Sequence, residues 1–327
     1  MNAFALTLLV AAQFLYYLLI AQTGIVEYFH SDLSRIFWLP LGGVVGTVLS
    51  SRLPGSERKR LTGLLILQGL ITLQYPALSP TLLWLLGIVM GASAPLMVRL
   101  LREGGAPVMG GALGLSYLVG TLLFTSPAAW RGPLGIGLTL LALLLLPWAN
   151  GRRNLSALPP LGAVSIATMA LWAFFDSALF ETLSRDASLS IWRDGYSLEI
   201  ATFHLAGVLL ALWFPLEWRR SRQFVALLFS AAYLSYLLAL PLVLAAVYPV
   251  VISYYNVVIL RRLSRERELS RIAAAMLAIG WGAAGAGLGA ALTGGTIFVA
   301  IVVLLYGIGH LLRVSRSFHL QRAESLK

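Results

Sequence analysis

Long uninterrupted runs of hydrophobic residues dominate the chain, and each run ends at a short polar segment. The run from Leu140 to Pro147 is typical, because it lacks the alternation of apolar and polar residues that marks a strand of a membrane barrel. A helix needs roughly 20 apolar residues to cross a bilayer. The pattern therefore predicts an all-α integral membrane protein with about twelve spanning helices. The expected spans are residues 4–26, 36–51, 61–75, 81–99, 107–126, 133–149, 160–181, 198–216, 223–240, 243–260, 272–293 and 296–313.

Composition supports lipid as the solvent of this chain. Charged residues make up only 11% of the sequence and the mean hydropathy is +0.84, whereas a soluble domain carries about 25% charged residues. The chain has no cysteine, which excludes disulfides, Cys-ligated zinc, iron–sulfur clusters and thiol nucleophiles. The first apolar run has no basic segment before it, so we expect a retained helix and not a cleaved signal peptide.

The basic residues are distributed unevenly between the two sides of the expected bundle. The net charge is +11, and only four of the 24 lysines and arginines fall in the odd-numbered loops, namely Arg35, Arg131, Arg185 and Arg193. Cytoplasmic loops of membrane proteins are enriched in Lys and Arg. The distribution therefore predicts that both termini are cytoplasmic, and it explains the positive charge without nucleic acid as a partner.

The two parts of the chain share a pattern. The first expected helix carries Gln22 and Glu27, and the seventh carries Asp176 and Glu181, each pair five residues apart. Each pair precedes an outward loop, a Gly-bearing helix and a basic inward loop. The pattern predicts two parallel six-helix halves, which is one plan of known transporters. The expected parts are residues 1–150, the short cytoplasmic linker 151–159, and residues 160–327 with a short cytoplasmic tail.

Small residues four apart recur on several expected helices. Residues at this spacing share a helix face and let two backbones approach closely, so we expect close helix packing at each pair. The pairs are Gly42/Gly46, Gly87/Gly91, Gly110/Gly114, Gly207/Ala211 and Gly285/Gly289.

The loop after the second expected helix is rich in glycine and basic residues. It reads Gly46-Thr-Val-Leu-Ser-Ser-Arg52-Leu-Pro-Gly55-Ser-Glu57-Arg58-Lys59-Arg60. This segment resembles the G-x-L-x-D-R-x-G-R-R-like motif of the major facilitator superfamily. Ser50 or Ser51 occupies the acidic position, and one extra residue precedes Gly55. The resemblance implies a gating loop formed by Gly46, Arg52, Gly55, Arg58 and Arg60.

In layout the whole chain resembles a compact member of that superfamily. The resemblance implies that helices 1, 4, 7 and 10 line a central cavity and that helices 2, 5, 8 and 11 pack across the two halves. It also implies a secondary transporter that works without a cofactor, with a small-molecule solute and membrane lipid as its partners. We expect a monomer in a bacterial inner membrane.

One carboxylate lies well inside the seventh expected span. Asp176 is about 9 Å outward from the midpoint of that span at 1.5 Å per residue, and it shares a helix face with Trp172. His204 of the eighth span lies at a similar depth, so the two residues are expected to be able to pair. Ionisable residues inside membrane spans are costly and mark functional sites. The alternatives are a structural Asp–His hydrogen bond and a carboxylate wetted at the outer interface.

Polar and aromatic residues gather on two further helices that the resemblance places beside the cavity. Such groups suit an amphipathic solute, because small-molecule pockets are mostly apolar with a few polar anchors. Packing between helices is the alternative. The candidates are Gln13, Tyr17 and Gln22 in the first helix and Tyr254, Tyr255 and Asn256 in the tenth. Glu27, Glu181 and Glu199 are expected at the outer interface.

The leading hypothesis is a proton-coupled secondary transporter of a small cationic, zwitterionic or neutral amphipathic solute, with Asp176 as the proton carrier. Export is favoured over uptake on the aromatic residues alone. The alternative is a non-transporting assembly or scaffold protein on a degenerate transporter fold, favoured by the altered loop. We expect no enzyme, because the sequence has no Walker loop, no zinc-protease motif and no complete nucleophile elbow. We expect no metal site.

Overall fold

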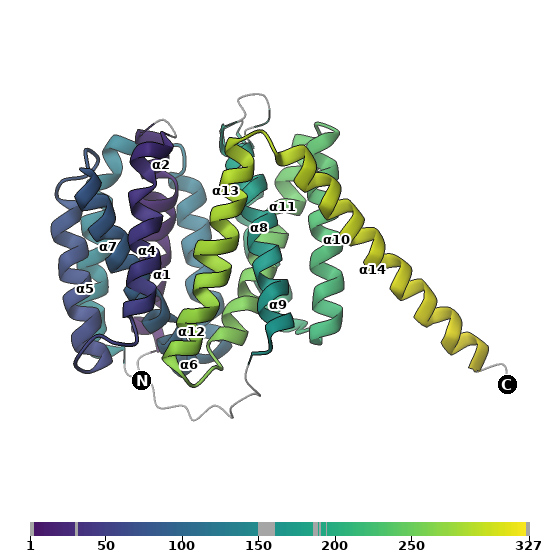
Figure 1. Cartoon of the computed structure of the whole chain (residues 1–327), viewed down its shortest axis with the longest axis horizontal. Helices are drawn as coiled ribbons and strands as arrows, with labels where there is room; N and C mark the ends of the chain where they lie inside the picture. Colours follow the sequence, from purple (N-terminus) through teal and green to yellow (C-terminus); the bar gives the residue numbers. More distant parts are fainter. Residues whose placement is uncertain are drawn as a thin grey trace.

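The computed structural model describes residues 3–29, 32–149, 161–185, 189, 191–193 and 195–324, with side chains through residue 312. All regular structure in these residues is helical, as expected from the sequence. Figure 1 shows the helices standing side by side, with those before residue 150 gathered on one side and those after residue 160 on the other. We call these sets the N-terminal group and the C-terminal group. The expected linker 151–159 lies outside the described residues.

The N-terminal group contains the following helices. They are α1 (Ala3–Tyr16), η1 (Tyr17–Gln22), α2 (Gly24–Tyr28), α3 (Leu33–Ile36), α4 (Trp38–Leu49), α5 (Glu57–Thr72), α6 (Pro80–Leu123), η2 (Ala128–Trp130), α7 (Arg131–Leu145) and η3 (Leu146–Trp148). The C-terminal group consists of α8 (Ala163–Arg185), α9 (Ser197–Trp213), α10 (Trp218–Leu237), α11 (Pro241–Leu263), α12 (Leu269–Met276), η4 (Leu277–Ala283), α13 (Ala284–Leu292) and α14 (Thr296–Glu324). Helices η1 and η4 are π-helical turns, and η2 and η3 are 3-10 turns.

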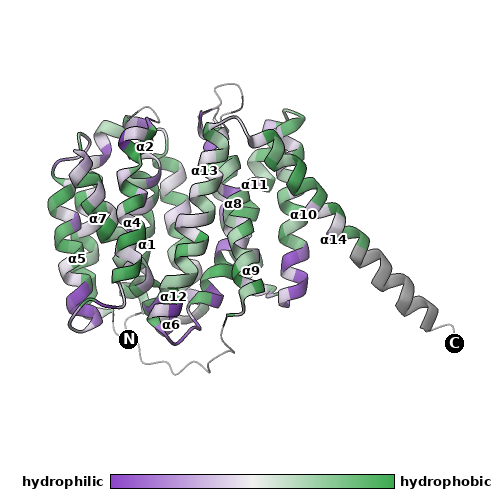
Figure 2. Ribbon diagram, viewed as in Figure 1, coloured by the Kyte–Doolittle hydropathy of each residue, from purple (hydrophilic) through white to green (hydrophobic). Residues whose placement is uncertain are grey.

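Six helical segments of the described chain are long and apolar enough to cross a membrane. They are Ala3–Tyr28, Pro80–Leu123, Ala128–Trp148, Ala163–Arg185, Pro241–Leu263 and Leu269–Leu292. Three shorter apolar helices accompany them, at Leu33–Leu49, Ser197–Trp213 and Thr296–Leu312. Figure 2 shows apolar residues along the bodies of the helices and hydrophilic residues gathered at their ends. The chain is an integral membrane protein by the length and composition of these segments.

Helix α6 differs from the sequence expectation. We expected a short loop between spans 81–99 and 107–126, but the helical backbone continues through this region and is broken at Gly105 alone. Gly105 has φ 72° and ψ −168°, a conformation that glycine adopts without a steric penalty. Pro107 follows two residues later, and its ring fits the first turn of the second segment. A single glycine therefore separates the two helical segments where we expected a loop.

Glycines bring α4 and α6 into direct backbone contact within the N-terminal group. A Cβ on Gly42 would strike the carbonyl of Trp84, and one on Gly87 would strike the carbonyl of Leu39. Gly46 and Gly91 meet the opposite backbone in the same way, at Ile88 and Gly43. The expected close packing is confirmed here, but the partner of α4 at these glycines lies in its own group and not across the two groups.

The glycine pair in α13 does not pack as expected. A Cβ on Gly285 or Gly289 would meet open space, whereas one on Gly287 would strike the carbonyl of Phe174 in α8. Residues 285 and 289 share a face, and residue 287 lies about 200° away from 285 on an α-helix. The G-x-x-x-G spacing identified a face of α13 that carries small residues, but α8 packs against the opposite face.

Contacts between the two groups occur at several levels. Gly110 and Gly114 of α6 face Leu212 and Leu205 of α9, as expected for a helix pair that crosses the groups. Trp281 of η4 packs against Gly43 of α4.

Candidate functional site

Asp176 of α8 is held by two tyrosines from α11. The hydroxyl of Tyr248 donates to Oδ1 at 2.8 Å, and that of Tyr255 donates to Oδ2 at 2.6 Å. Tyr248 and Tyr255 are seven residues apart, which places them two turns apart on one face of α11. Charge-assisted hydrogen bonds of this kind are strong. Asp176 as a whole residue is half-buried.

His204 does not pair with Asp176, and the expectation that these residues form a pair is wrong. Its Nδ1 lies 2.8 Å from the hydroxyl of Ser253 in α11, and its ring stacks on Tyr117 with centroids 4.4 Å apart and planes 8° apart. Similar depth in neighbouring helices does not place two side chains on facing surfaces. Here α11 supplies the partners of both residues, Ser253 to His204 and the two tyrosines to Asp176.

Tyr117 connects the two groups at the level of these residues. It belongs to α6 of the N-terminal group, and its hydroxyl accepts a hydrogen bond from Nδ2 of Asn256 at 2.9 Å. Because Tyr117 also stacks on His204, it contacts both α9 and α11. Asn256 therefore lies in the cluster, as the sequence indicated, and Tyr117 is a member that the sequence reading missed.

The polar run in α11 divides between two faces. Tyr255 points to Asp176, whereas the ring of Tyr254 packs edge-to-face on Phe224 of α10, with centroids 4.9 Å apart. Consecutive helical residues point about 100° apart, and at this offset Tyr254 faces α10 and not Asp176. Tyr254 therefore packs between α10 and α11, away from the hydrogen bonds of Asp176, and its role at the site stays a prediction.

Trp172 lies one turn before Asp176, on the same face of α8. Its side chain is fully buried, and its ring lies 6.5 Å from that of Tyr255 and 5.5 Å from that of Trp218 in α10. The indole Nε1 has no hydrogen-bond partner among the described residues. Trp172 therefore packs among aromatic rings next to Tyr255.

The candidates from the first helix lie around the π-helical turn η1. Tyr17 begins this turn and Gln22 ends it. Tyr17 is 43% exposed, yet it is close enough to Glu181 and Asp176 for their charges to act on it. Gln13 is buried one turn earlier, and its Nε2 has no partner among the described residues. Single π-turns inside α-helices are frequent at functional sites.

Glu181 is not at an exposed interface, which corrects the sequence expectation. It is 5% exposed, and its Oε2 accepts a hydrogen bond from Nη2 of Arg185 at 3.1 Å. The spacing of four residues between Glu181 and Arg185 is that of a helical ion pair, and this signal was available in the sequence.

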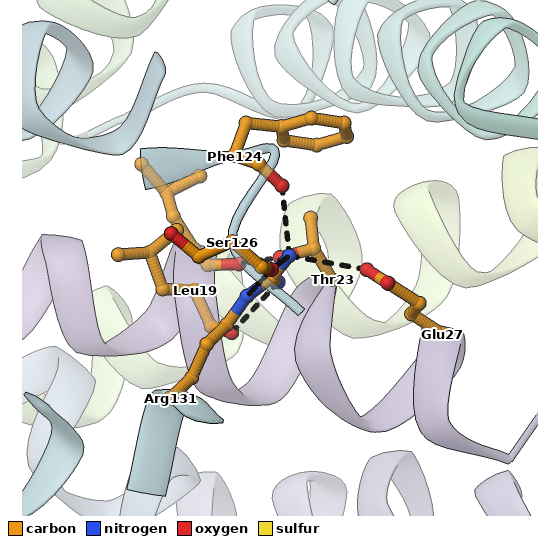
Figure 3. A network of polar contacts seen from close by, with 7 residues as sticks. Leu19, Thr23, Glu27, Phe124, Ser126 and Arg131 are labelled. Carbon is orange, nitrogen blue, oxygen red and sulfur yellow. Dashed lines mark hydrogen bonds and ion pairs between the residues drawn. The ribbon is translucent and has the colours of Figure 1, made fainter. Parts of the chain in front are cut away.

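Arg131 forms a network that sequence reasoning missed. Its guanidinium is 1% exposed and lies 3.1 Å from Oε2 of Glu27. It also donates to the hydroxyl of Thr23 at 2.8 Å and to three backbone carbonyls. These carbonyls belong to Leu19, Phe124 and Ser126. Figure 3 shows the guanidinium at the centre of these groups. Arg131 thus joins η1, α2, the end of α6 and the start of α7.

The loop after α4 shows few of the contacts that a charge relay needs. Ser50 is buried, and its hydroxyl donates to the carbonyl of Thr47 within its own turn. Arg60 donates to the carbonyl of Ser50 at 3.4 Å. Glu57 instead forms an ion pair with Arg99 of α6, with 2.9 Å between Nε and Oε1. Of the other residues expected to form the gating loop, Gly46 packs on α6, Arg52 is exposed, Arg58 is half-buried, and Gly55 forms the turn with φ 93°.

Comparison with known proteins identifies the fold. No protein-family model and no curated protein matches the chain. Among solved structures, it is similar to the major facilitator superfamily proton:xylose symporter XylE bound to 6-bromo-6-deoxy-D-glucose, with a TM-score of 0.64, 12% identity, and coverage of 95% of this chain and 94% of that chain. A double tryptophan mutant of XylE gives a TM-score of 0.60 at 13% identity, with 94% and 93% of the two chains covered. The chain therefore has the fold of the major facilitator superfamily.

Proposed function

We propose that this protein is a secondary active transporter of a small solute. The observation that supports this function best is a carboxylate, Asp176, held by two tyrosine hydroxyls beside a residue that joins the two groups, Tyr117. An ionisable group at such a place costs stability and is usually retained for function. The fold is one in which the two parts rock around a central site.

Asp176 is the proton carrier in this proposal. Protonation would remove the charge that Tyr248 and Tyr255 stabilise, so proton binding and the arrangement of α8 against α11 are linked. Tyr17 of the N-terminal group, which is 43% exposed, is a further candidate for this site. His204, engaged with Ser253 and Tyr117, holds the wall of the site and does not carry the proton.

The solute in this proposal is a small cation, zwitterion or neutral amphipath. Tyr17 and Asn256 offer a hydroxyl and an amide, and Asp176 offers a carboxylate. The apolar surroundings suit the rest of an amphipathic molecule. We retain export as the direction, on the aromatic character of Trp172 and Tyr255.

The proposal includes twelve membrane crossings in two six-helix halves. Helix α6 counts twice, because Gly105 divides it, and α1–η1–α2 and α12–η4–α13 each count once. The basic loops favour cytoplasmic termini, and we propose a monomer in a bacterial inner membrane.

Contacts above and below the Asp176 cluster fit alternating access. Towards one end, Trp281 of η4 donates from Nε1 to the hydroxyl of Thr47 in α4 at 2.9 Å. Towards the other end, the ring of Phe124 contacts that of Trp192 at 5.6 Å between centroids. Each contact joins the N-terminal group to the C-terminal group, so each must break when access opens at its own end.

Proteoliposomes that contain a pH-sensitive dye test this function. The purified chain is challenged with a panel of primary amines, quaternary ammonium compounds, amino acids and neutral amphipaths. We expect at least one class to drive proton movement and to show counterflow. Folded protein that moves none of them and no protons would contradict the proposal and would favour a non-transporting assembly or scaffold role. The self-contained turn of Ser50 in the altered loop is the observation that supports that second function.

A further inference from the structure

Four arginines gather at one end of the C-terminal group, where α10 begins and α11 ends. Arg222 lies in the second turn of α10, Arg261 and Arg262 lie in the last turn of α11, and Arg265 follows that helix. All four side chains are half-buried. We call this set the arginine patch. Figure 2 shows the hydrophilic start of α10 directly below its apolar body.

Two of these guanidinium groups share one aromatic surface. The guanidinium carbon of Arg262 lies 3.7 Å from the ring centroid of Trp218, and that of Arg222 lies 5.8 Å from it. A guanidinium that stacks on a ring keeps its N–H groups free to donate at its edge. Trp218 therefore holds two planar donors at fixed positions.

The positive charges of the patch act on one another. Arg262 is close enough to Arg265 and Arg222 for like-charge repulsion, and Arg261 is close enough to Arg265. Repulsion of this kind is stronger at half-buried positions than in bulk water, because the effective dielectric constant is lower. An anion among the arginines would relieve this repulsion.

Two nearby carboxylates, Glu266 and Glu268, have other partners, and the exposed Glu217 at the start of α10 forms no ion pair among the described residues. Both carboxylate oxygens of Glu266 accept backbone N–H groups, from Leu161 and Arg267. Glu268 pairs with Arg271. No ion pair among the described residues joins the patch to an acid, and Nε of Arg222 is buried without a hydrogen-bond partner there.

We propose that the arginine patch binds the phosphate group of an anionic phospholipid. Guanidinium groups match phosphate oxygens as paired donors. The patch lies at helix ends next to the apolar body of α10, where a lipid headgroup and its acyl chains would each meet suitable surface. Tryptophan prefers this interfacial level, and basic pockets between helix ends bind such headgroups. The site is independent of the transport function proposed above.

Lipid-dependent thermal stability and native mass spectrometry test the site. The purified full chain in neutral detergent is titrated with phosphatidylglycerol, with phosphatidylcholine of the same chains, and with inorganic phosphate. The test variant is Arg222→Gln/Arg262→Gln. The matched control is Arg52→Gln/Lys59→Gln, which removes equal charge from exposed positions in the N-terminal group. Arg262→Lys keeps the charge but loses the planar donor, and it serves as a second variant should the double variant fold poorly.

We expect phosphatidylglycerol to bind and stabilise the wild type more than phosphatidylcholine does. The double variant should lose about thirtyfold in apparent affinity for phosphatidylglycerol, the control should match the wild type, and Arg262→Lys should lie between them. A saturable effect of inorganic phosphate equal to that of the lipid would assign the site to a free phosphate and overturn the lipid proposal. Equal losses in the double variant and the control would show general charge attraction and also overturn it. Wild-type affinity in Arg262→Lys and in the double variant would do the same.

Discussion

The hydroxyl of Tyr255 lies 2.6 Å from Oδ2 of Asp176 and joins α11 to α8. Tyr248 binds the other oxygen of the same carboxylate from two turns away. Both oxygens of the proposed proton carrier thus depend on one neighbouring helix. A change in the charge of Asp176 therefore alters hydrogen bonds to α11 directly. The same helix carries Ser253, which bonds to His204, and Asn256, which bonds to Tyr117.

Replacement of the carboxylate separates coupling from solute binding. We expect Asp176→Asn to abolish uphill accumulation of a solute found in the proteoliposome panel, because the amide carries no exchangeable charge. Counterflow of the same solute should persist, because the neutral amide resembles the protonated acid. Asp32→Asn, at an exposed helix start, is the control and should behave as the wild type. Full uphill transport by Asp176→Asn would reject the proton-carrier role.

Loss of the buried guanidinium at residue 131 should destabilise the fold. Arg131→Met leaves three carbonyls and Thr23 without their donor, and a buried polar group left unsatisfied costs about 1–3 kcal/mol. Arg131→Lys should recover part of the loss, because one ammonium cannot reach all of these groups. Arg35→Met is the matched control, because Arg35 is 64% exposed in its pair with Asp32. Thermal unfolding in detergent measures the differences, and equal midpoints for Arg131→Met and Arg35→Met would refute the argument.

Neighbouring glycines in α13 should differ sharply in their tolerance of bulk. Gly287→Leu should lower the folded yield severalfold, because a Cβ there already strikes the backbone of α8. Gly285→Leu should leave the yield near that of the wild type, because that position faces open space. Size-exclusion chromatography of both variants measures folded yield. Loss of yield in Gly285→Leu alone would mean that α8 packs on the other face.

Because the chain has no native cysteine, pairs of introduced cysteines can be cross-linked across the two groups without competing thiols. We expect a short thiol cross-linker to stop transport in Thr47→Cys/Trp281→Cys and also in Phe124→Cys/Trp192→Cys, because each pair joins the groups towards a different end. Both variants should transport before cross-linking. Gln68→Cys/Thr139→Cys is the control, since these residues bond within the N-terminal group, and it should transport after cross-linking. Continued flux through either cross-linked pair would contradict alternating access.

Sequence pattern located the helices well because membrane helices must be apolar along their length. It also located Asp176, because a carboxylate stands out in an apolar run. Its partners were harder to predict. Four consecutive polar residues, 253–256, cover nearly a full helical turn, so periodicity alone could not separate Tyr255 from Tyr254. Tyr248 and Tyr117 lie among apolar residues and gave no signal.

Arg131 was missed for a different reason. A basic residue at the end of an apolar run looks like a loop residue, and only the tertiary fold shows that five acceptors from four segments surround it. The glycine spacing in α13 failed in a similar way. A sequence shows which face of a helix carries small residues. Only the tertiary structure shows which face contacts another helix.

Gly105 alone separates the two segments of α6, with no loop between them. The first segment is locked to α4 through glycine contacts at Gly87 and Gly91, and the second faces α9 through Gly110 and Gly114. A loop would spread a displacement of the second segment over many torsion angles, whereas here it falls on the few torsions around Gly105. A rotation of the surface that meets α9 relative to the α4–α6 pair would therefore have to occur at the backbone torsions of Gly105.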